Sequence, residues 1–292
     1  MRYAFVARER TCYPLRLLCR LLCRLLDVSV SGFHDHCRRQ RTPCPDPDAA
    51  VRADLRTIYD GSRQTYGRPR LVKALRACAH PIGPKRVARL MREEGLRGRV
   101  KGRFKPRTTD SKHGHPIAAN VLDRRFAVDT AVPAWVSDIT YIATREGWLY
   151  LAAVIDVRTR QVLGYSLSER MPDDLVQQAF LNAVAAAPVE RGVLFHSDRG
   201  SQYASAAFRH TLTTCGFVPN MSRKGNCWDN AVAESFFATL KNEEATGTYV
   251  SKAEAYTAIA SYIHGFYNPT RLHSALGYLS PNDYAKTLKQ AA

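Results

Sequence analysis

The sequences WVSDITYI at residues 135–142 and GWLYLAAVID at residues 147–156 indicate how the chain folds. β-Branched and aromatic residues dominate both stretches, which predicts two strands, the second more deeply buried. Farther along, apolar spacing predicts a strand at 161–166, a helix at 175–187, a strand at 192–198, a helix at 204–215, a strand at 217–220 and a helix at 229–241. Elements in this order predict an α/β fold, a mixed sheet flanked by helices.

Three acidic residues stand out in this region. Asp138 lies inside the first predicted strand and Asp198 ends the strand at 192–198, and both have apolar surroundings. An ionised carboxylate in such a place is costly unless it meets a cation. Glu234 lies in the helix at 229–241 and shares a helical face with Lys241. Three carboxylates supply the hard oxygen ligands that suit Mg²⁺ or Mn²⁺, so we expect a divalent-metal site.

Other polar residues nearby have structural interpretations. Asp156 begins a hairpin turn, a position that favours Asp for backbone reasons, and Asp229 or Asn230 can cap the N-terminus of the following helix. His196 precedes Asp198 by two residues and therefore shares its strand face. Its ring either lies near the metal site or packs in the core.

A loop before the last predicted helix carries Arg223 and Lys224 next to a glycine. These two side chains either contact DNA or are simply exposed. Trp228 in the same loop either stacks on a base or anchors the loop in the core, and burial is the more common role of a single Trp.

The positive charge is concentrated in the first part of the chain. The whole sequence has 43 Lys or Arg and 26 Asp or Glu, a net charge of +17, while residues 1–125 alone hold 29 and 11. The remainder is therefore close to neutral. A basic region joined to a near-neutral globular domain indicates a polyanion partner, with nucleic acid the leading candidate.

Residues 51–98 predict three short helices, the last of which begins at Pro84, a residue suited to the first position of a helix. The apolar residues of that helix share one face, and its basic residues, including Lys85, Arg86 and Arg89, point outward. Short helices joined by a turn, with a basic outer face, are typical of a helix-turn-helix DNA-binding unit. The same periodicity also fits other three-helix bundles.

The N-terminal segment contains Arg16, Arg20 and Arg24 at intervals of four, which places them on one helical stripe. The stripe is either a solvated face or a phosphate-contacting one. These arginines also interrupt the leucines around them, which excludes a secretory signal, and there is no uncharged stretch of the roughly 20 residues that span a bilayer. The sequence HDHC at 34–37 fits no zinc spacing, and eight cysteines without a C-x-x-C pair indicate reduced thiols.

We therefore expect a soluble cytoplasmic protein with no membrane partner. Its predicted segments are a basic helical segment at 1–45, a helix-turn-helix-like module at 46–98, a basic linker at 99–125, a catalytic core at 126–245 and a C-terminal helical tail at 246–292.

The sequences around the three acids resemble a known family. W-x-x-D-I-T-Y contains Asp138, H-S-D-R-G-S-Q-Y contains Asp198 and K-G-N-x-W-D-N-A-x-x-E-S contains Glu234. Together they resemble the DDE catalytic domain of transposases and retroviral integrases, and in particular the second-frame (OrfB) protein of bacterial insertion elements of the insertion-sequence-three family. The resemblance covers nearly the whole chain and includes YGRPR at 66–70, RVARLM at 86–91, GWLYL at 147–151 and YNPTRLHSALGY at 267–278.

The resemblance implies an RNase H-like core in which Asp138, Asp198 and Glu234 are catalytic and hold two Mg²⁺ or Mn²⁺ ions, while Lys241 holds DNA. It also implies a polynucleotidyl transferase that cuts a strand at the element's end and joins the exposed 3′-OH to another phosphodiester. The implied partners are terminal inverted repeats, target DNA, further copies of the chain on DNA, and a protein encoded by an upstream frame. The implied location is the bacterial cytoplasm, in association with the nucleoid.

Three alternatives remain open at this stage. One is a catalytically inert DNA-binding regulator derived from a transposase, and another is a retroelement integrase, which requires an N-terminal His-His-Cys-Cys zinc module. The third is a tyrosine recombinase that uses Tyr267 with Arg271 and His273, a reading that leaves the acids unexplained. The sequence also departs from the family pattern V-S-R-S-G-Y-Y-x-W at residues 28–36, which read VSVSGFHDH.

Overall fold

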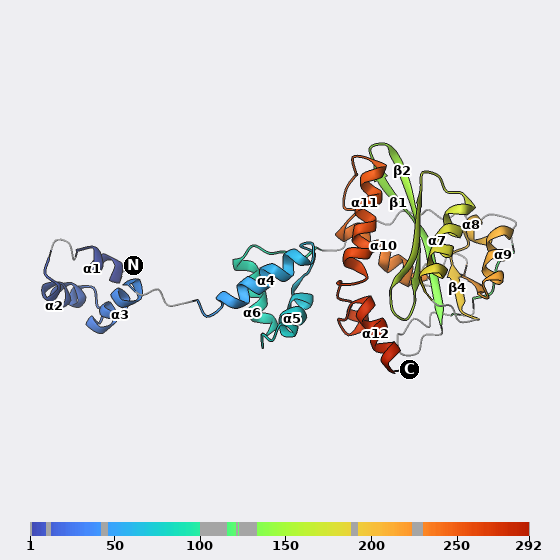
Figure 1. Ribbon diagram of the computed structural model, residues 1–292. Coiled ribbons are helices and arrows are strands. Elements are labelled where there is room, and N and C mark those ends of the chain that lie inside the picture. Colours follow the sequence, from blue (N-terminus) through green and yellow to red (C-terminus); the bar gives the residue numbers. More distant parts are fainter. Residues whose placement is uncertain are drawn as a thin grey trace. The chain divides into compact units, whose positions relative to one another are not determined.

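The structure is a computed structural model, and its description covers residues 2–9, 13–41, 46–99, 116–120, 122, 133–187, 192–223 and 230–291 (Figure 1). The chain divides into two units, residues 1–54 and 55–292. Most of the predicted basic linker, together with Lys224, Trp228 and Asp229, lies outside the described residues. In the described part, no helix is both long enough and apolar enough to cross a bilayer.

The first unit contains three helices, α1 (Arg2–Arg8), α2 (Leu15–Leu25) and α3 (Val30–Arg41). Val6, Cys23 and Phe33, one from each helix, form its small buried core. Arg16, Arg20 and Arg24 are exposed along α2, as their spacing predicts.

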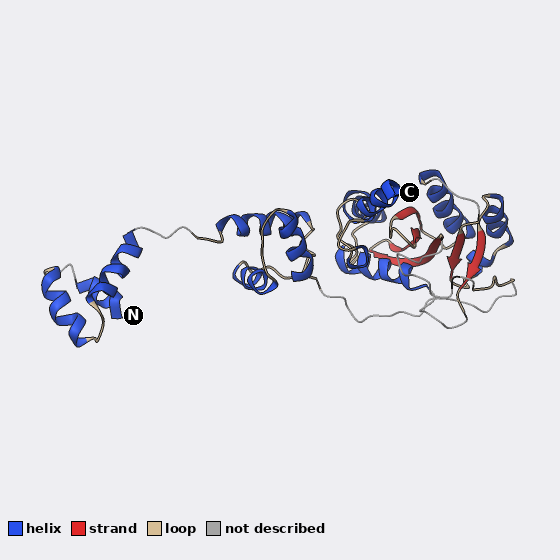
Figure 2. Ribbon diagram, turned by 90° about the horizontal axis from the view of Figure 1, so that it is seen from below, coloured by secondary structure: helices blue, strands red, loops and turns tan. Residues whose placement is uncertain are grey.

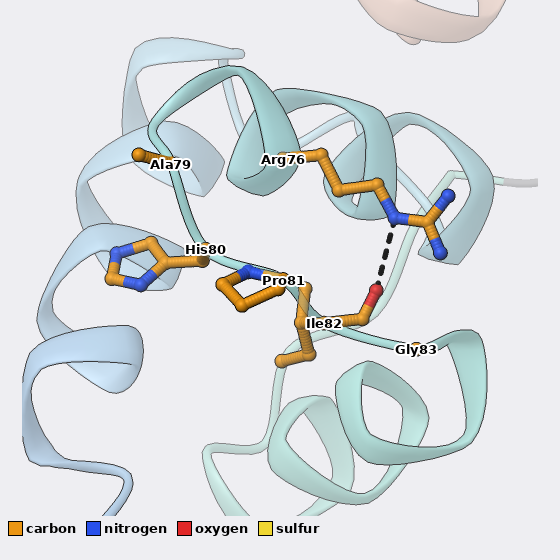
Figure 3. Close-up of a pocket in the computed structure, with 6 residues that line it drawn as sticks. All are labelled: Arg76, Ala79, His80, Pro81, Ile82 and Gly83. Carbon is orange, nitrogen blue, oxygen red and sulfur yellow. Dashed lines mark hydrogen bonds between the residues drawn. The ribbon is translucent and has the colours of Figure 1, made fainter.

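The second unit begins with a helical module of α4 (Ala49–Gly61, which starts in the first unit), α5 (Arg68–Ala77) and α6 (Pro84–Glu93). Both α5 and α6 have proline in the first turn, where the missing N–H costs no helical hydrogen bond. Figure 3 shows the turn between them, where an open pocket lies next to Arg76, whose Nε donates to Ile82 O at 3.0 Å. The apolar residues of both helices pack together: Leu71, Val72, Leu75, Val87, Leu90 and Met91.

The five-stranded sheet has the order β3-β2-β1-β4-β5. Strands β1 (Ala134–Thr144), β2 (Gly147–Asp156) and β3 (Val162–Ser168) form an antiparallel meander, whereas β4 (Leu194–Ser197) and β5 (Val218–Met221) continue the sheet in parallel from β1. The sheet is therefore mixed, as predicted, and β1 lies at its centre.

Helices cover both faces of this sheet (Figure 2). On one face, α7 (Asp173–Ala186), α8 (Ser201–Ala204) and α9 (Ala206–Thr214) close an aromatic core, in which the Phe180 ring meets those of Phe195, Phe208 and Phe217 edge-on at 5.0–5.9 Å. Gly164 allows β3 and α7 to approach closely, because a Cβ there would lie 2.3 Å from the Ala183 nitrogen.

Helix α10 (Ala231–Glu243) packs on the opposite face against β1, and α11 (Lys252–Tyr262) contacts the same strand. A π-helical turn, η3 (Ile263–Tyr267), follows α11, and the tail ends with η4 (Ser274–Leu276) and α12 (Pro281–Ala291).

Some predicted helices have different bounds in the structure. The helix predicted at 204–215 begins only at Ala206, because Ser205 is extended and caps α9 by accepting from Phe208 N at 3.3 Å, and the four-residue α8 precedes it. The last helix of the module ends at Glu93, and Gly95 follows with a positive φ of 69°. A left-handed glycine just beyond a helix is a common terminator.

Candidate active site

The two aspartates are brought side by side by the register of the sheet. Parallel strands β1 and β4 pair Ala134 with Leu194 and Val136 with His196, a constant offset of 60 residues. Carried two residues beyond the last pair, the same offset places Asp138 opposite Asp198, the first residue after β4. Neighbouring strands are about 4.8 Å apart, so the two carboxylates leave the same face of the sheet as neighbours.

Glu234 reaches this face from helix α10. The residue before the helix, Asn230, donates from Nδ2 to the carbonyl oxygen of Ser137 at 3.2 Å, which ties the start of α10 to β1 next to Asp138. Glu234 lies one turn further along the helix and is exposed. The first turn of α10 therefore lies against the two aspartates.

The three acids interact electrostatically. Burial raises the pKa of Asp138 well above its usual value, and the negative charges of Asp198 and Glu234 raise it further. A hydrogen bond from Ile139 N to Asp138 Oδ1, 2.8 Å long, and the positive charge of Lys241 act in the opposite direction. Three carboxylates thus repel one another at a place where a cation is favourable.

Asn230 was missed by sequence reasoning, which placed this position at the helix cap. Its side chain makes no capping bond, and its residue is only 5% exposed. The amide orientation is fixed, because only the NH₂ group can donate to the Ser137 carbonyl. Its Oδ1 is consequently buried without a hydrogen-bond partner among the described residues. The only sequence signal for this role was the Asn in the W-D-N-A segment.

The oxygen atoms of these side chains are suitable ligands for a hard divalent cation. Two neighbouring carboxylates and an unpartnered amide oxygen are oxygen ligands of the kind that Mg²⁺ and Mn²⁺ prefer. As their side chains stand, no three His, Cys, Asp or Glu residues of the described ranges form a ready-made metal site. Glu234 is exposed, so its side chain can change rotamer towards the aspartates without disturbing the core.

Three family models match parts of the chain. Residues 132–227 match a model described as an integrase core domain, residues 216–281 match a second integrase core domain model, and residues 46–104 match an HTH-like domain.

Relatives of the whole chain show its family. It is 38% identical over 272 residues to the insertion element IS600 uncharacterized 31 kDa protein of Shigella sonnei, covering 93% of this chain and 100% of that protein. It is 36% identical over 287 residues to transposase InsF for insertion sequence IS3A of Escherichia coli, covering 97% and 98%. The chain belongs to the IS3 family of transposases.

Solved structures similar to this transposase include two integrase cores. The catalytic core domain of BIV integrase aligns with a TM-score of 0.39 and 13% identity, covering 55% of this chain and 97% of that one. The HTLV-2 integrase catalytic core domain in complex with magnesium aligns with a TM-score of 0.36 and 17% identity, covering 48% and 87%.

Two polar residues of the transposase have structural roles near the site. His196 is fully buried, with Nε2 3.0 Å from Ser222 Oγ and Nδ1 3.0 Å from Asn220 Nδ2, so its ring joins β4 to β5. Asp156 Oδ1 accepts from the backbone nitrogen and the hydroxyl of Thr159, which confirms its predicted role in the turn.

The predicted DNA-binding residues lie in three places. Lys85, Arg86 and Arg89 are exposed on α6, where Arg89 also pairs with Glu93 at 3.0 Å. Arg223 is exposed immediately before the segment that contains Lys224, which lies outside the described residues. Lys241 is half-buried on α10, and burial lowers its pKa while Asp138 raises it.

The tyrosine-recombinase alternative is wrong. Tyr267 is 2% exposed, and burial raises the pKa of its hydroxyl to about 12. Its presumed partner Arg271 is buried in an ion pair with Glu243. A nucleophile must reach a phosphate, and this hydroxyl is enclosed in the core.

Proposed function

We propose that this transposase cuts and joins DNA by two-metal phosphoryl transfer, with Asp138, Asp198 and Glu234 as its catalytic acids. The observation that carries the proposal is the register of β1 and β4, which aligns the two aspartates on the face that the first turn of α10 covers.

Both other acids act electrostatically on Asp138, which would hold both cations, while Asp198 and Glu234 would each hold one of them. The chemistry supplied by bound Mg²⁺ or Mn²⁺ is activation of the attacking oxygen, stabilisation of the leaving 3′ oxygen and charge neutralisation at phosphorus. Asp198 is already oriented, because its Oδ1 accepts from Gly200 N at 2.9 Å.

Basic side chains would bring the DNA to these acids. Lys241 lies two turns beyond Glu234 on the same helical face, where it can hold a phosphate of the reacting strand. Arg223 and Lys224 precede α10 and would extend that contact. Lys85, Arg86 and Arg89 would hold the terminal inverted repeats from the outer face of α6.

The same proposal includes the assembly in which the reaction takes place. Joining two element ends to target DNA requires more than one copy of the chain on DNA, and a protein encoded by an upstream frame would assist end recognition. Such a complex would work on the bacterial nucleoid in the cytoplasm.

The test is strand cleavage of linear DNA that carries the element's ends. Asp138→Asn, Asp198→Asn and Glu234→Gln should each lower the Mg²⁺- or Mn²⁺-dependent rate by about a thousandfold or more, because each removes a charged metal ligand. Asp174→Asn, the same change at an exposed position of α7, should leave the rate unchanged. Activity in the three acid variants equal to that of the parent would refute the assignment.

A further inference from the structure

Two sequence motifs more than 200 residues apart meet in this structure. YGRPR at 66–70 leads into α5, and residues 270–272 follow η3 in the tail. The hydroxyl of Tyr66 donates to Thr270 O at 3.2 Å and accepts from Leu272 N at 2.7 Å. Arg70 Nε donates to Leu272 O at 2.9 Å. The helical module therefore holds a short segment of the tail by its backbone.

The same tail segment binds Glu243, the last residue of α10. Arg271 donates from Nε and Nη2 to the two carboxylate oxygens of Glu243, both at 2.7 Å, and Tyr262 OH donates to Glu243 at 2.9 Å. Glu243 is 6% exposed and Arg271 is 3% exposed. Arg70 Nη1 lies 3.9 Å from the same carboxylate. We call Tyr66, Arg70, Glu243 and Arg271 the docking cluster.

Two further arginines, one in the module and one directly after it, contact the same end of α10. Arg63 pairs with Glu244 and donates to Ser261 Oγ at 3.0 Å. Arg99 Nη1 lies 3.4 and 3.3 Å from the carbonyl oxygens of Asn242 and Glu243. The last carbonyls of a helix lack intrahelical partners and carry partial negative charge, so cations are favourable there.

We propose that Tyr66 and Arg70 are positioning residues that dock the helix-turn-helix-like module onto the C-terminal end of α10. Glu234 lies nine residues before Glu243, about 13 Å along the same helix axis. The docking then holds DNA bound by the module in a fixed position relative to the acid carried by α10. The link to catalysis rests on the proposed role of Glu234, whereas the docking itself does not.

Tyr66→Phe in the full chain tests this proposal, because it removes one hydroxyl and the two bonds that the hydroxyl makes. Tyr59→Phe is the matched control: Tyr59 is also buried in the module, but its hydroxyl donates to Arg97 O at 2.8 Å, within the module. Arg70→Gln removes the second contact to the tail and provides an independent variant.

Three quantities should be measured: amide hydrogen exchange of residues 240–245 and 270–273, the Kd for end-containing DNA, and the single-turnover cleavage rate at saturating DNA and Mg²⁺. Tyr66→Phe and Arg70→Gln should accelerate exchange in both segments about tenfold and lower the cleavage rate about tenfold, because a backbone N–H or carbonyl loses its partner. The Kd should stay within about twofold, since neither residue lies on the outer face of α6. Tyr59→Phe should leave exchange in both segments unchanged.

Unchanged exchange in Tyr66→Phe and Arg70→Gln, or equal acceleration in Tyr59→Phe, would overturn the docking. Faster exchange with an unchanged cleavage rate would overturn the positioning role. If the parent chain does not cleave DNA, the catalytic proposal fails, and the exchange data alone still decide whether the module is docked on α10.

Discussion

The two ends of α10 each carry a glutamate, and their surroundings are opposite. Glu234 in the first turn is exposed and adds its negative charge to Asp138 and Asp198. Glu243 in the last turn is buried, and Arg271 and Tyr262 donate to both of its oxygens. At the first end the negative charges repel one another, and a bound cation can relieve this repulsion. At the second end the positive charge of Arg271 neutralises the negative charge of Glu243. One helix thus carries the proposed catalytic Glu234 near its start and a structural Glu243 at its end.

The largest expected effect comes from breaking the neutralised end. Glu243→Gln leaves Arg271 buried without its counter-charge, so the free energy of unfolding should fall by about 3–5 kcal/mol. Chemical denaturation of the full chain measures this loss. Glu93→Gln is the control, because its exposed pair with Arg89 should contribute no more than about 0.5 kcal/mol. Similar losses in the two variants would show that burial does not distinguish these pairs.

At the acidic end the same kind of substitution should have the opposite sign. Asp138→Asn removes a partly buried charge that Asp198 and Glu234 repel, so without divalent cations the chain should gain stability at neutral pH. Mg²⁺ or Mn²⁺ should raise the Tm of the parent and not that of the variant. Asp174→Asn should keep the metal-induced rise. A destabilised Asp138→Asn variant with the full rise would contradict the metal site.

His273 gives the neutralised end a pH dependence. Burial, followed by the charges of Arg271, Arg70 and Arg160, lowers the pKa of its imidazole from 6.5 to about 3. As the pH falls, His273 is therefore protonated in the unfolded chain before it is protonated in the folded one. Its contribution to the free energy of unfolding is complete above about pH 6.5 and is lost as the pH falls towards 3, by up to about 1.4 kcal/mol per pH unit.

The measurement is unfolding free energy against pH for the parent and His273→Gln, whose amide can still accept from Arg271. The variant should have the shallower slope below pH 6.5. His210→Gln, at an exposed position of α9, should follow the parent. Identical slopes in all three proteins would show that His273 is not buried as a neutral group.

The smallest effect is expected from substituting Lys241, which lies towards the end of α10. Its positive charge interacts with the negative charge of Asp138. Lys241→Gln should weaken DNA binding several-fold and reduce the slope of log K against log salt by about 1. The variant makes one phosphate contact fewer, so DNA binding releases fewer counterions. Lys289→Gln on exposed α12 should change neither quantity. Titrations at several salt concentrations distinguish the two variants, and an unchanged slope for Lys241→Gln would remove Lys241 from the DNA contact.

The sequence predicted the elements of the sheet and the acids because both depend on local patterns. Apolar runs identified the strands, and a carboxylate within such a run identified Asp138 and Asp198. Asp156, in a similar run, was correctly separated from them, because the turn that follows it explains an aspartate without a metal. Whether the three acids act together in catalysis stays a prediction.

The docking cluster could not be predicted in the same way. Glu243 and Arg271 are polar residues in polar stretches, and no periodicity connects them with Tyr66 or Arg70. Their pairing depends on tertiary contacts across most of the chain. The family resemblance included both motifs without giving either a role. Asn230 was also misjudged, because a cap and a tertiary hydrogen-bond donor have the same local sequence.

The shared register of β1 and β4 also limits how this chain can diverge. Extra residues in the β1–β2 hairpin or after α7 leave the alignment of Asp138 with Asp198 intact. One residue inserted within β4 would turn the second carboxylate to the far side of the sheet, since neighbouring side chains on a strand alternate. Natural length variation in working homologues should therefore gather in the connections and spare these two short strand segments.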